Sequence, residues 1–402
     1  MSDPDTHDLS PTVTALMAIA CGAMVANLYY AQTLIGMIAP DIGLSSSAAG
    51  GIVTLTQLGY GLGLAFIVPL SDLIENKRLI VIATAGAALG CIGIALAEGP
   101  RTFLVAASVT GICSVGAQVL VPLAAILSSK ARQGRTIGLV MSGLLTGIML
   151  ARPVASFVAG AFGWRALFFG SAGVTALVGI ALLTMLPARR PTSTLRYTAL
   201  LASSLDLLRR HPALRLRAAY QALLFIAFNL FWTAAPLVLT QRFGLGANGI
   251  ALFALAGAGG ALAAPIAGYF ADKGRARATT LVALVLLTLS FIAADLVVAA
   301  GALIAFAVTA VLIDAAVQLN QISGQRIIFG LDSAAGGRIN AAYMTIVFVF
   351  GASGSLIGSA SFAAGGWSLS SLIGAAIGAA ALLLYLLFDR RPATTRATPR
   401  DD

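Results

Sequence analysis

The sequence predicts an all-α integral membrane protein built from two pseudo-symmetric bundles of six transmembrane helices each. Three observations carry this prediction: a composition that is 59% hydrophobic and only 10% charged, a series of long apolar segments, and a repeat of the same residues about 200 positions apart. A soluble chain of 402 residues could not bury that much apolar surface. A β-barrel would show short alternating segments instead of continuous apolar runs.

Twelve apolar segments are long enough to cross a hydrocarbon core of about 30 Å as helices. In chain order they cover residues 13–38, 47–70, 79–97, 102–127, 136–158, 164–186, 214–240, 247–270, 278–299, 302–325, 337–361 and 367–388. They divide the chain into a cytoplasmic N-terminal tail, a first bundle, a cytoplasmic linker, a second bundle and a cytoplasmic C-terminal tail. These parts are expected at residues 1–12, 13–186, 187–213, 214–388 and 389–402.

Short elements of the first half recur in the second half at a nearly constant distance. The pairs are Asn27-Leu28-Tyr29-Tyr30 with Asn229-Leu230-Phe231-Trp232, Asp72 with Asp272, Ser114 and Gln118 with Asp314 and Gln318, and Gly163-Trp164 with Gly366-Trp367. Gene duplication followed by small loop insertions leaves such a pattern. The repeats therefore predict two parallel bundles with a pathway between them.

The net charge of +10 does not indicate nucleic-acid binding, because of where the basic residues lie. Of 25 Lys and Arg, Arg101, Arg152, Arg165 and Arg242 lie on the expected outer side or deep inside a span, and the others lie in the expected cytoplasmic loops, linker and tail or at the cytoplasmic ends of spans. Basic loops stay in the cytoplasm, so both termini are expected there. The basic charge then contacts the anionic headgroups of the lipid bilayer.

Nothing in the sequence indicates an enzyme, a metal site or a cofactor. Cys21, Cys91 and Cys113 lie inside apolar segments without metal-ligand spacing, and His7 and His211 lie outside the expected spans. No nucleophile–base constellation or phosphate-binding loop is found. Residues 1–12 lack the basic region of a signal peptide, so the first apolar segment is expected to remain as a helix.

The linker carries many arginines, and its Leu201, Leu205 and Leu208 are spaced for one face of a helix. This pattern predicts a basic amphipathic helix on the inner leaflet. We interpret it as a tether between the bundles, with a regulatory role as the alternative.

An acid followed by bases comes after both the second and the eighth span. The later copy contains Gly268, Asp272, Lys273 and Arg275, and the earlier copy keeps Asp72, Lys77 and Arg78 but has Val68 and Glu75 at the glycine positions of the pattern. With twelve spans in two halves, these loops resemble the major facilitator superfamily of secondary transporters. The resemblance covers about residues 12–388.

The resemblance implies that these loop residues latch the cytoplasmic side while the outer side is open. An acid at a helix end beside bases can form charge-assisted contacts in one arrangement and lose them in another. The expected latch consists of Asp72, Lys77, Arg78, Gly268, Asp272, Lys273 and Arg275. The alternative is that these residues only set the membrane topology.

The fifth span resembles the glycine-rich signature of proton antiporters in the same superfamily. Gly138 and Gly147 have the matching separation, but Arg152 stands where that signature has proline. The motif therefore supports an exporter without establishing it. Arg152 could snorkel to the outer headgroups, bind an anionic substrate or pair with Asp314.

Asp314 lies roughly 18 Å into the tenth span, close to the middle of the membrane. A carboxylate there is costly unless it faces water or a partner, and it suits a group that binds and releases protons. Gln318, Gln321 and Gln325 follow on the same helical stripe. We expect Asp314 to be the proton-coupling residue, with a structural polar network as the alternative.

The duplicated amide and aromatic residues lie near the middle of the first and seventh spans. The resemblance places both spans, with the fourth and tenth, at a central substrate cavity, where amides beside flat apolar surfaces commonly bind ligands. Packing alone is the other interpretation. The expected lining is Asn27, Tyr29, Tyr30, Gln32, Gln57, Gln118, Arg152, Asn229, Phe231, Trp232, Thr233, Gln318, Gln321, Tyr343, Met344 and Phe348.

The resemblance implies a monomeric transporter of the bacterial inner membrane that moves a small-molecule substrate by alternating access. It is most similar to the drug- and metabolite-efflux branch, in which protons are exchanged for substrate. One alternative is a proton symporter that imports an organic acid held by Arg152. Another is a non-transporting receptor or lipid-moving protein on the same fold. The duplicated loops argue against a passive channel.

Overall fold

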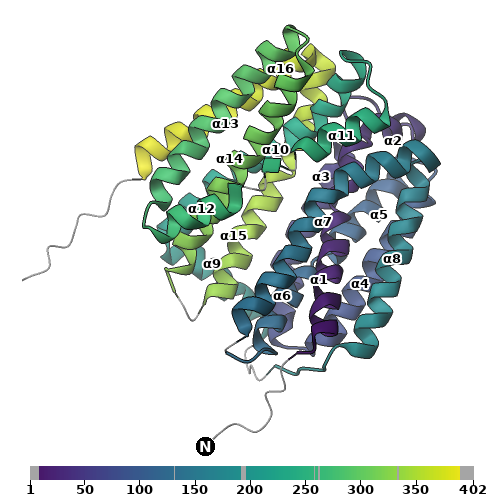
Figure 1. The fold of residues 1–402 in the computed structure, drawn as a ribbon. Coiled ribbons are helices and arrows are strands. Elements are labelled where there is room, and N and C mark those ends of the chain that lie inside the picture. Colours follow the sequence, from purple (N-terminus) through teal and green to yellow (C-terminus); the bar gives the residue numbers. More distant parts are fainter. Residues whose placement is uncertain are drawn as a thin grey trace, which may run out of the picture.

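The computed structural model describes residues 9–130, 132–191, 196–257, 259–260, 263–332 and 335–389, and these residues form helices without strands (Figure 1). The expected tails therefore fall mostly outside the described residues. In chain order, the helices are α1 (Pro11–Ala26), η1 (Tyr30–Thr33), α2 (Ile35–Asp41), α3 (Gly51–Phe66), η2 (Val68–Asp72), α4 (Asn76–Ala95), α5 (Pro100–Cys113), α6 (Gly116–Ile126), α7 (Gln133–Phe162), α8 (Trp164–Met185), α9 (Tyr197–Arg210), α10 (Pro212–Gln241), α11 (Ala247–Gly257), α12 (Ala263–Asp272), α13 (Ala276–Ala299), α14 (Leu303–Phe329), α15 (Gly336–Gly351) and α16 (Ser353–Phe388).

Each of the twelve expected apolar segments falls on one or more of these helices. Within the described ranges, nine helical stretches are long and apolar enough to cross a membrane. The first, second, fourth and eighth expected segments are divided between shorter helices. The eleventh is divided between α15 and α16, and α16 continues through a bend at Gly365 and Gly366 into the twelfth. The prediction of an all-α membrane protein is thus confirmed, while the count of twelve spans stays a prediction.

Local sequence explains where several helices begin. The Ser10 hydroxyl accepts a hydrogen bond from the backbone N–H of Val13, and Pro11 occupies the first turn of α1, where no partner for its nitrogen is needed. Pro100 and Pro212 start α5 and α10 in the same way. Between α7 and α8, Gly163 adopts φ +82°, a conformation that reverses the chain and that few other residues tolerate.

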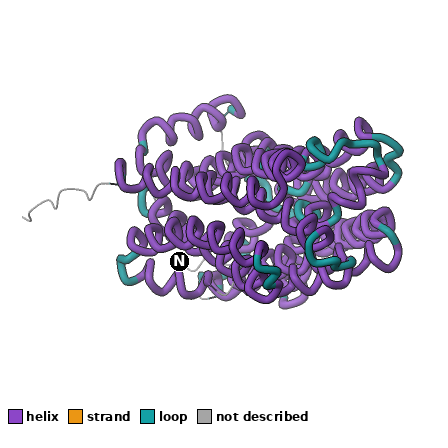
Figure 2. Tube along the Cα trace, turned by 90° about the horizontal axis from the view of Figure 1, so that it is seen from above, coloured by secondary structure: helices purple, strands orange, loops and turns teal. Residues whose placement is uncertain are grey.

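The helices pack as two groups joined by the linker helix α9. Within the first group α1 packs on α7, α3 on α5, and α4 on α5 and α8; within the second, α10 packs on α16, and α13 on α14 and α16. The two groups stand side by side in Figure 1, and Figure 2 shows the helices of both from above. We use "seam" for the surface where η1, α3 and α7 face α10, α11, α15 and α16.

Glycines bring backbones into direct contact inside each group. A Cβ atom on Gly147 of α7 would lie 2.3 Å from the carbonyl oxygen of Gly22 in α1, and one on Gly354 of α16 would lie 2.1 Å from that of Ile226 in α10. Small residues allow such approaches where lipid offers no hydrophobic drive for helix association. These contacts fix α7 against α1 and α16 against α10, and so set the position of the side chains that these helices carry to the seam.

The seam is tightly closed at the end of the molecule that carries α2. The backbone N–H of Gly50 donates to Ser359 Oγ over 3.0 Å, and Thr54 Oγ1 donates to the carbonyl of Ala352 over 2.7 Å. A Cβ on Gly50 would lie 1.9 Å from the carbonyl oxygen of Ser355, and one on Gly160 would lie 2.7 Å from Ala247. The two groups therefore meet backbone to backbone at this end.

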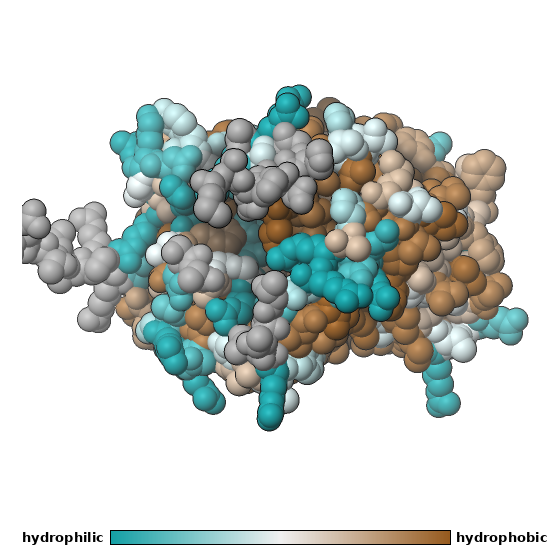
Figure 3. Space-filling model, turned by 90° about the horizontal axis from the view of Figure 1, so that it is seen from below, coloured by the Kyte–Doolittle hydropathy of each residue, from teal (hydrophilic) through white to brown (hydrophobic). Residues whose placement is uncertain are grey.

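The opposite end carries the linker helix, and hydrophilic side chains gather there (Figure 3). Tyr197 of α9 donates to the carbonyl of Phe66 in the first group, and Arg338 of the second group donates to Ser203 of α9. The linker thus contacts both groups. Its packed leucines are Leu200 and Leu207, whereas Leu205, which was expected on the apolar face with the half-buried Leu201 and Leu208, is 59% exposed.

Replacing Gly147 by alanine should destabilise the protein, because the added methyl group would collide with the backbone of α1. Overpacking of this kind costs about 1–3 kcal/mol. We expect a fall of several degrees in the melting temperature of the detergent-purified protein. Gly138→Ala on the same helix is the control, since nothing lies within 4 Å of the added atom. Equal melting temperatures for the two variants would contradict the packing described here.

Candidate functional site

A buried arginine lies at the seam with its guanidinium facing the second group. Arg152 of α7 is 4% exposed, although the polar end of a long side chain usually reaches solvent. Its guanidinium carbon is 4.4 Å from the ring centroid of Trp232, 4.9 Å from that of Phe228 and 5.1 Å from that of Tyr29. Three aromatic rings therefore surround the cation and offer it cation–π attraction. The side chain occupies this cage and does not extend to the outer surface.

A chain of amides continues from Arg152 across the seam. Arg152 Nε donates to Gln32 Oε1 over 2.9 Å, and Gln32 Nε2 donates to Asn229 Oδ1 over 3.0 Å. Gln57 Nε2 donates to the same oxygen over 3.0 Å, while Asn229 Nδ2 donates to Gln57 Oε1 over 2.7 Å and to the carbonyl of Gly351 over 3.0 Å. Gln32, Gln57 and Asn229, called here the amide chain, are all fully buried.

The amide chain joins three elements of the first group, α7, η1 and α3, to α10 and α15 of the second. The bonds that join Asn229 to Gln32 and Gln57 cross between the groups, and the bond from Arg152 leads to Gln32. The bond from Asn229 to Gly351 stays within the second group. Buried networks of this kind are costly when partly broken, because each lost partner leaves a desolvated polar group. The closed arrangement of the seam is therefore specified by these bonds.

Asp314 of α14 completes the site from the second group. Trp232 Nε1 donates to Asp314 Oδ1 over 2.7 Å, and the carboxylate is 8% exposed. Among the described residues no ion pair joins Asp314 to Arg152, so the indole of Trp232 stands between the two charges, with Arg152 over its face and Asp314 at its edge.

Glycines at the break between α11 and α12 hold this arrangement from behind. A Cβ on Gly257 would lie 2.5 Å from the Trp232 ring, and a Cβ on Gly260 would lie 2.4 Å from Asp314 Cβ. The division of the eighth expected span into two helices thus has a packing consequence. The backbone there comes close enough to fix both the indole and the carboxylate.

One hydrogen-bond donor of Arg152 has no partner. Its Nη2 is buried and makes no hydrogen bond to any described residue. A buried guanidinium N–H without an acceptor carries a desolvation penalty of about 1–3 kcal/mol. A hydrogen-bond acceptor placed at Nη2 by a ligand would remove this penalty.

Other residues expected at the cavity also come to the seam or beside it. Tyr60 accepts from Gln118 over 2.9 Å and packs its ring 4.6 Å from that of Phe348, so α6, α3 and α15 meet there. Gln321 accepts from Gln221 over 3.0 Å and approaches Met344 Sδ at 3.9 Å. Gln318 is partly exposed one turn after Asp314.

Several expected lining residues face the interior of their own group instead. Asn27 accepts from Ser171 of α8 over 2.6 Å, and Tyr30 packs against Phe168 of the same helix at 6.5 Å. Phe231 lies among aromatic rings of α13, α14 and α16. Thr233 packs close to Gly358 of α16, and Tyr343 is fully buried with a hydroxyl that has no described partner. The rings around Phe231 are Trp232, Phe291, Phe306 and Trp367.

The expected latch residues lie at the linker end of the molecule. Asp72 is exposed and forms no ion pair with a described residue, whereas Glu75 lies 3.7 Å from Arg78 and 3.8 Å from Arg190 of the linker. The sequence had marked Glu75 only as a departure from the glycine of the pattern. Lys77 is partly exposed. Because the arginine of each pair is largely exposed, such pairs contribute only about 0–1 kcal/mol.

In the second copy, Asp272 lies 3.4 Å from Arg326 at the end of α14, and both side chains are mostly exposed. Lys273 bonds to the hydroxyl of Tyr269 and lies over its ring, Gly268 has open space around it, and Arg275 is exposed. The expected latch residues of the second copy therefore do not form one cluster among the described residues, and those with partners make separate surface contacts within the second group.

Sequence reasoning missed a buried ion pair in the second group. Arg217 at the start of α10 pairs with Asp389, which follows α16, and both side chains are 3% exposed. Arg277 lies 3.3 Å from the same carboxylate, and Arg217 also donates to Thr280 Oγ1 over 3.0 Å. The only available signal was an arginine just inside the seventh apolar segment, and the many arginines of the neighbouring linker hid it.

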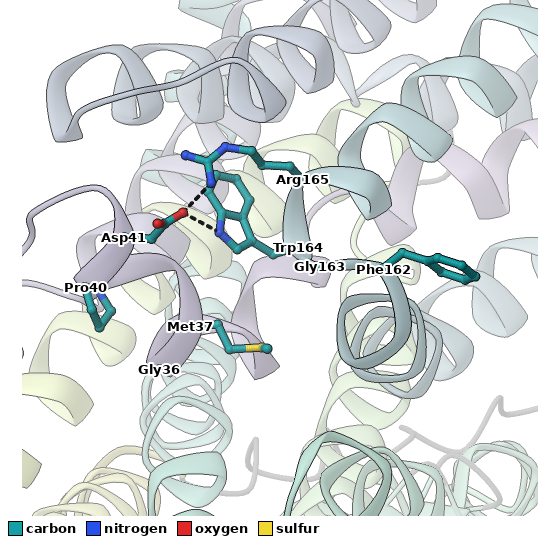
Figure 4. A pocket seen from close by; sticks show the side chains of 8 residues that line it. All are labelled: Gly36, Met37, Pro40, Asp41, Phe162, Gly163, Trp164 and Arg165. Carbon is teal, nitrogen blue, oxygen red and sulfur yellow. Dashed lines mark hydrogen bonds and ion pairs between the residues drawn. The ribbon is translucent and has the colours of Figure 1, made fainter.

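A shallow pocket of about 730 Å³ lies at the α2 end, away from Arg152 and Asp314 (Figure 4). Asp41 there accepts hydrogen bonds from Arg165 and from Trp164 Nε1, and these donors hold the pKa of Asp41 below its ordinary value. All polar groups drawn in this pocket already have partners. We therefore assign it to the attachment of α2 to α8. Its lining is Gly36, Met37, Pro40, Asp41, Phe162, Gly163, Trp164 and Arg165.

A membrane-embedded helical protein with a charged, amide-lined site between two helix groups belongs to the class of membrane transport proteins. The profile of the Major Facilitator Superfamily matches residues 15–316 and 218–402. The chain is a member of the Major Facilitator Superfamily, and hence a multi-pass membrane transporter of small molecules and not an enzyme.

Relatives and solved structures agree with this assignment. The chain is 42% identical to the uncharacterized transporter YgaY of Escherichia coli O157:H7 over 96% of this chain and 97% of that protein. It is 32% identical to a probable transporter of Streptomyces coelicolor over 88% of this chain and 82% of that protein. It is 28% identical to a chloramphenicol resistance protein of Streptomyces lividans over 65% and 67%.

Two crystal structures show the same fold. The nucleoside transporter NupG superposes with a TM-score of 0.75 at 12% identity, covering 94% of this chain and all of that chain. A D-xylose–proton symporter gives a TM-score of 0.75 at 17% identity, covering 93% and 96%. At these identities the likeness shows the fold alone.

Replacing Asn229 by leucine, which has a similar shape, should loosen the closed end of the seam. The change removes both crossings of the amide chain, and each buried group left without a partner costs about 1–3 kcal/mol. The measurement is the labelling rate of a single cysteine placed at Ser359. We expect faster labelling in the Asn229→Leu background.

Gln325→Leu is the matched control, since the bond that Gln325 makes among the described residues is to Asn340, within the second group. An unchanged labelling rate at Ser359 in the Asn229→Leu protein would show that the amide chain does not hold the seam closed.

Proposed function

We propose that this protein exports a small organic molecule across the bacterial inner membrane in exchange for protons. The observation that carries the proposal is the buried carboxylate of Asp314, which is held by a single described hydrogen bond and lies at the seam beside a buried cation. A carboxylate in this position is costly in the charged state and is found in membrane proteins where protons are bound and released.

Alternating access requires that the two bundles, residues 13–186 and 214–388, rock about the seam. The closed α2 end supports this, because backbone-to-backbone contact between the bundles at one end is what one extreme of such a motion would show. With both termini in the cytoplasm, as the distribution of basic residues predicts, the α2 end is the outer one. Opening of the buried site in this arrangement is therefore expected on the cytoplasmic side, and its described residues all come from one chain, as expected of a monomer.

Export is supported by two features. The fifth span carries the glycine run that resembles the antiporter signature, and one relative is a chloramphenicol resistance protein. Exchange also suits a site with one carboxylate, because a proton and a substrate that needs the ionised carboxylate cannot both bind there.

A second candidate is a proton symporter that imports an organic acid. The specific observation that favours it is the unpartnered Nη2 of Arg152, which could hold a carboxylate. In that case the proton on Asp314 and the anion on Arg152 would bind together and travel in the same direction.

The Asp314→Asn variant tests the coupling. In proteoliposomes screened with aromatic acids, cationic dyes, sugars and chloramphenicol, substrate movement driven by a pH gradient should fall at least about tenfold, which corresponds to about 1.4 kcal/mol. Exchange of labelled for unlabelled substrate should persist, because it needs no net proton movement.

Asp295→Asn is the matched control, since Asp295 is a carboxylate of α13 that accepts from Ser368 and lies away from the seam. Normal uphill transport by Asp314→Asn would place proton coupling elsewhere. The direction of lumen pH change on adding substrate separates exchange from symport.

A further inference from the structure

The two buried charges at the seam balance each other without touching. Arg152 brings a positive charge from α7 and Asp314 a negative charge from α14, and no ion pair joins them within the described part of the chain. A ligand that brings a further net charge would leave this buried site charged. Burying an unbalanced charge is far more costly than burying a polar neutral group.

Arg152 offers a fixed donor to such a ligand. Its Nε donates to Gln32, and the rings of Trp232, Phe228 and Tyr29 surround the guanidinium. These contacts restrain the side chain, so the unpartnered Nη2 has a fixed position. A guanidinium donates only, and the missing partner is therefore a hydrogen-bond acceptor.

Asp314 offers the complementary group. Its Oδ1 receives the indole N–H of Trp232, and no described residue donates to Oδ2. An ionised carboxylate accepts hydrogen bonds at both oxygens, so a ligand group at Oδ2 must be a donor. The donor and acceptor of the site thus lie on different sides of one indole ring.

The buried side chains of α10 that lead from the two charges toward the linker end are aromatic. Phe225, Phe228 and Trp232 of α10 follow at intervals of three and four residues and share one helix face, with Phe225 and Phe228 stacked at 5.5 Å. Phe348 of α15 lies 5.0 Å from Phe225 across this face. Flat apolar groups pack well on such rings.

We infer that the site selects flat organic molecules without net charge that place an acceptor on Arg152 and a donor on Asp314, such as aromatic carboxamides. The inference rests on the proposed transport function and adds its substrate class. It also supplies a reason for exchange: a proton on Asp314 Oδ2 turns that oxygen into a donor and weakens it as an acceptor, so proton and ligand donor compete for one oxygen.

Among the described residues, Trp232 of α10 bonds to Asp314 and Gly260, at the break between α11 and α12, packs against its Cβ. Arg152 of α7 and Tyr29, from the segment between α1 and η1, lie within electrostatic range of the carboxylate. Arg152 stays charged and Tyr29 stays neutral under ordinary conditions. Competition between proton and ligand therefore takes place at Asp314.

The test compares three isosteric series of aromatic ligands: carboxamides, carboxylates and amidinium ions. Binding to the detergent-purified, full-length protein is measured by calorimetry at several pH values. The carboxamides should bind at least about tenfold more tightly than the matched carboxylates and amidinium ions. Their affinity should fall at acid pH in wild type and become independent of pH in Asp314→Asn.

Tighter binding of the carboxylates or of the amidinium ions would overturn the inference, and so would a lack of carboxamide binding across the series. Arg152→Lys should weaken carboxamide binding about tenfold, whereas Arg165→Lys at the outer pocket should leave it unchanged. The melting temperature of each variant shows whether it is folded. If Arg152→Lys is not folded, the pH dependence of carboxamide binding to Asp314→Asn still tests the inference.

Failure of this inference and failure of the proposed function are distinguishable, because binding in detergent requires no proton gradient. Selective carboxamide binding without proton-driven transport would support the ligand class and contradict proton coupling. Proton-driven transport of an anion would support proton coupling and contradict the ligand class.

Discussion

The arrangement of the seam depends on accommodating one buried guanidinium. A cation taken out of water needs strong compensation, and Arg152 receives it from three aromatic rings and from the oxygen of Gln32. Gln32 in turn is positioned by Asn229, and Asn229 by Gln57 and the backbone of Gly351. The relative placement of η1, α3, α7, α10 and α15 therefore follows from satisfying a single charge at their common boundary.

The helix framework is repeated in both halves, whereas each of the two buried charges at the seam occurs in one half only. Close glycine contacts fix α7 on α1 in the first group and α16 on α10 in the second. At the spacing that relates Gly163 to Gly366, however, the position equivalent to Arg152 is Ser355, whose backbone meets Gly50 at the closed end. The position equivalent to Asp314 is Ser114, which bonds to its own helix. In each of these two pairs, one copy contributes a charged side chain to the candidate site, and the other contributes a small serine to the packing of the helices.

The helical membrane class, the family and the presence of charges at Asp314 and Arg152 inside expected spans were accessible from sequence, because apolar length, repeats and charges inside spans are local signals. Which of several neighbouring polar residues faces the seam was not accessible. Consecutive residues on a helix point about 100° apart, so Asn229 and Trp232 reach the seam while Phe231, between them, enters the core of the second group. The ion pair of Arg217 with Asp389 was hidden for a different reason, since pairing across so long a sequence separation leaves no local pattern.

The ion pair of Arg217 with Asp389 also constrains the order in which the second group can assemble during synthesis. Arg217 lies 172 residues before Asp389, so the ribosome delivers the arginine to the bilayer long before its carboxylate exists. During synthesis of α11 to α16 the guanidinium must remain at the lipid headgroups or in water, and it can settle into its buried position only when the end of the last helix arrives. Burial of Arg217 in the second group is therefore completed only after Asp389, which follows α16, has been synthesised.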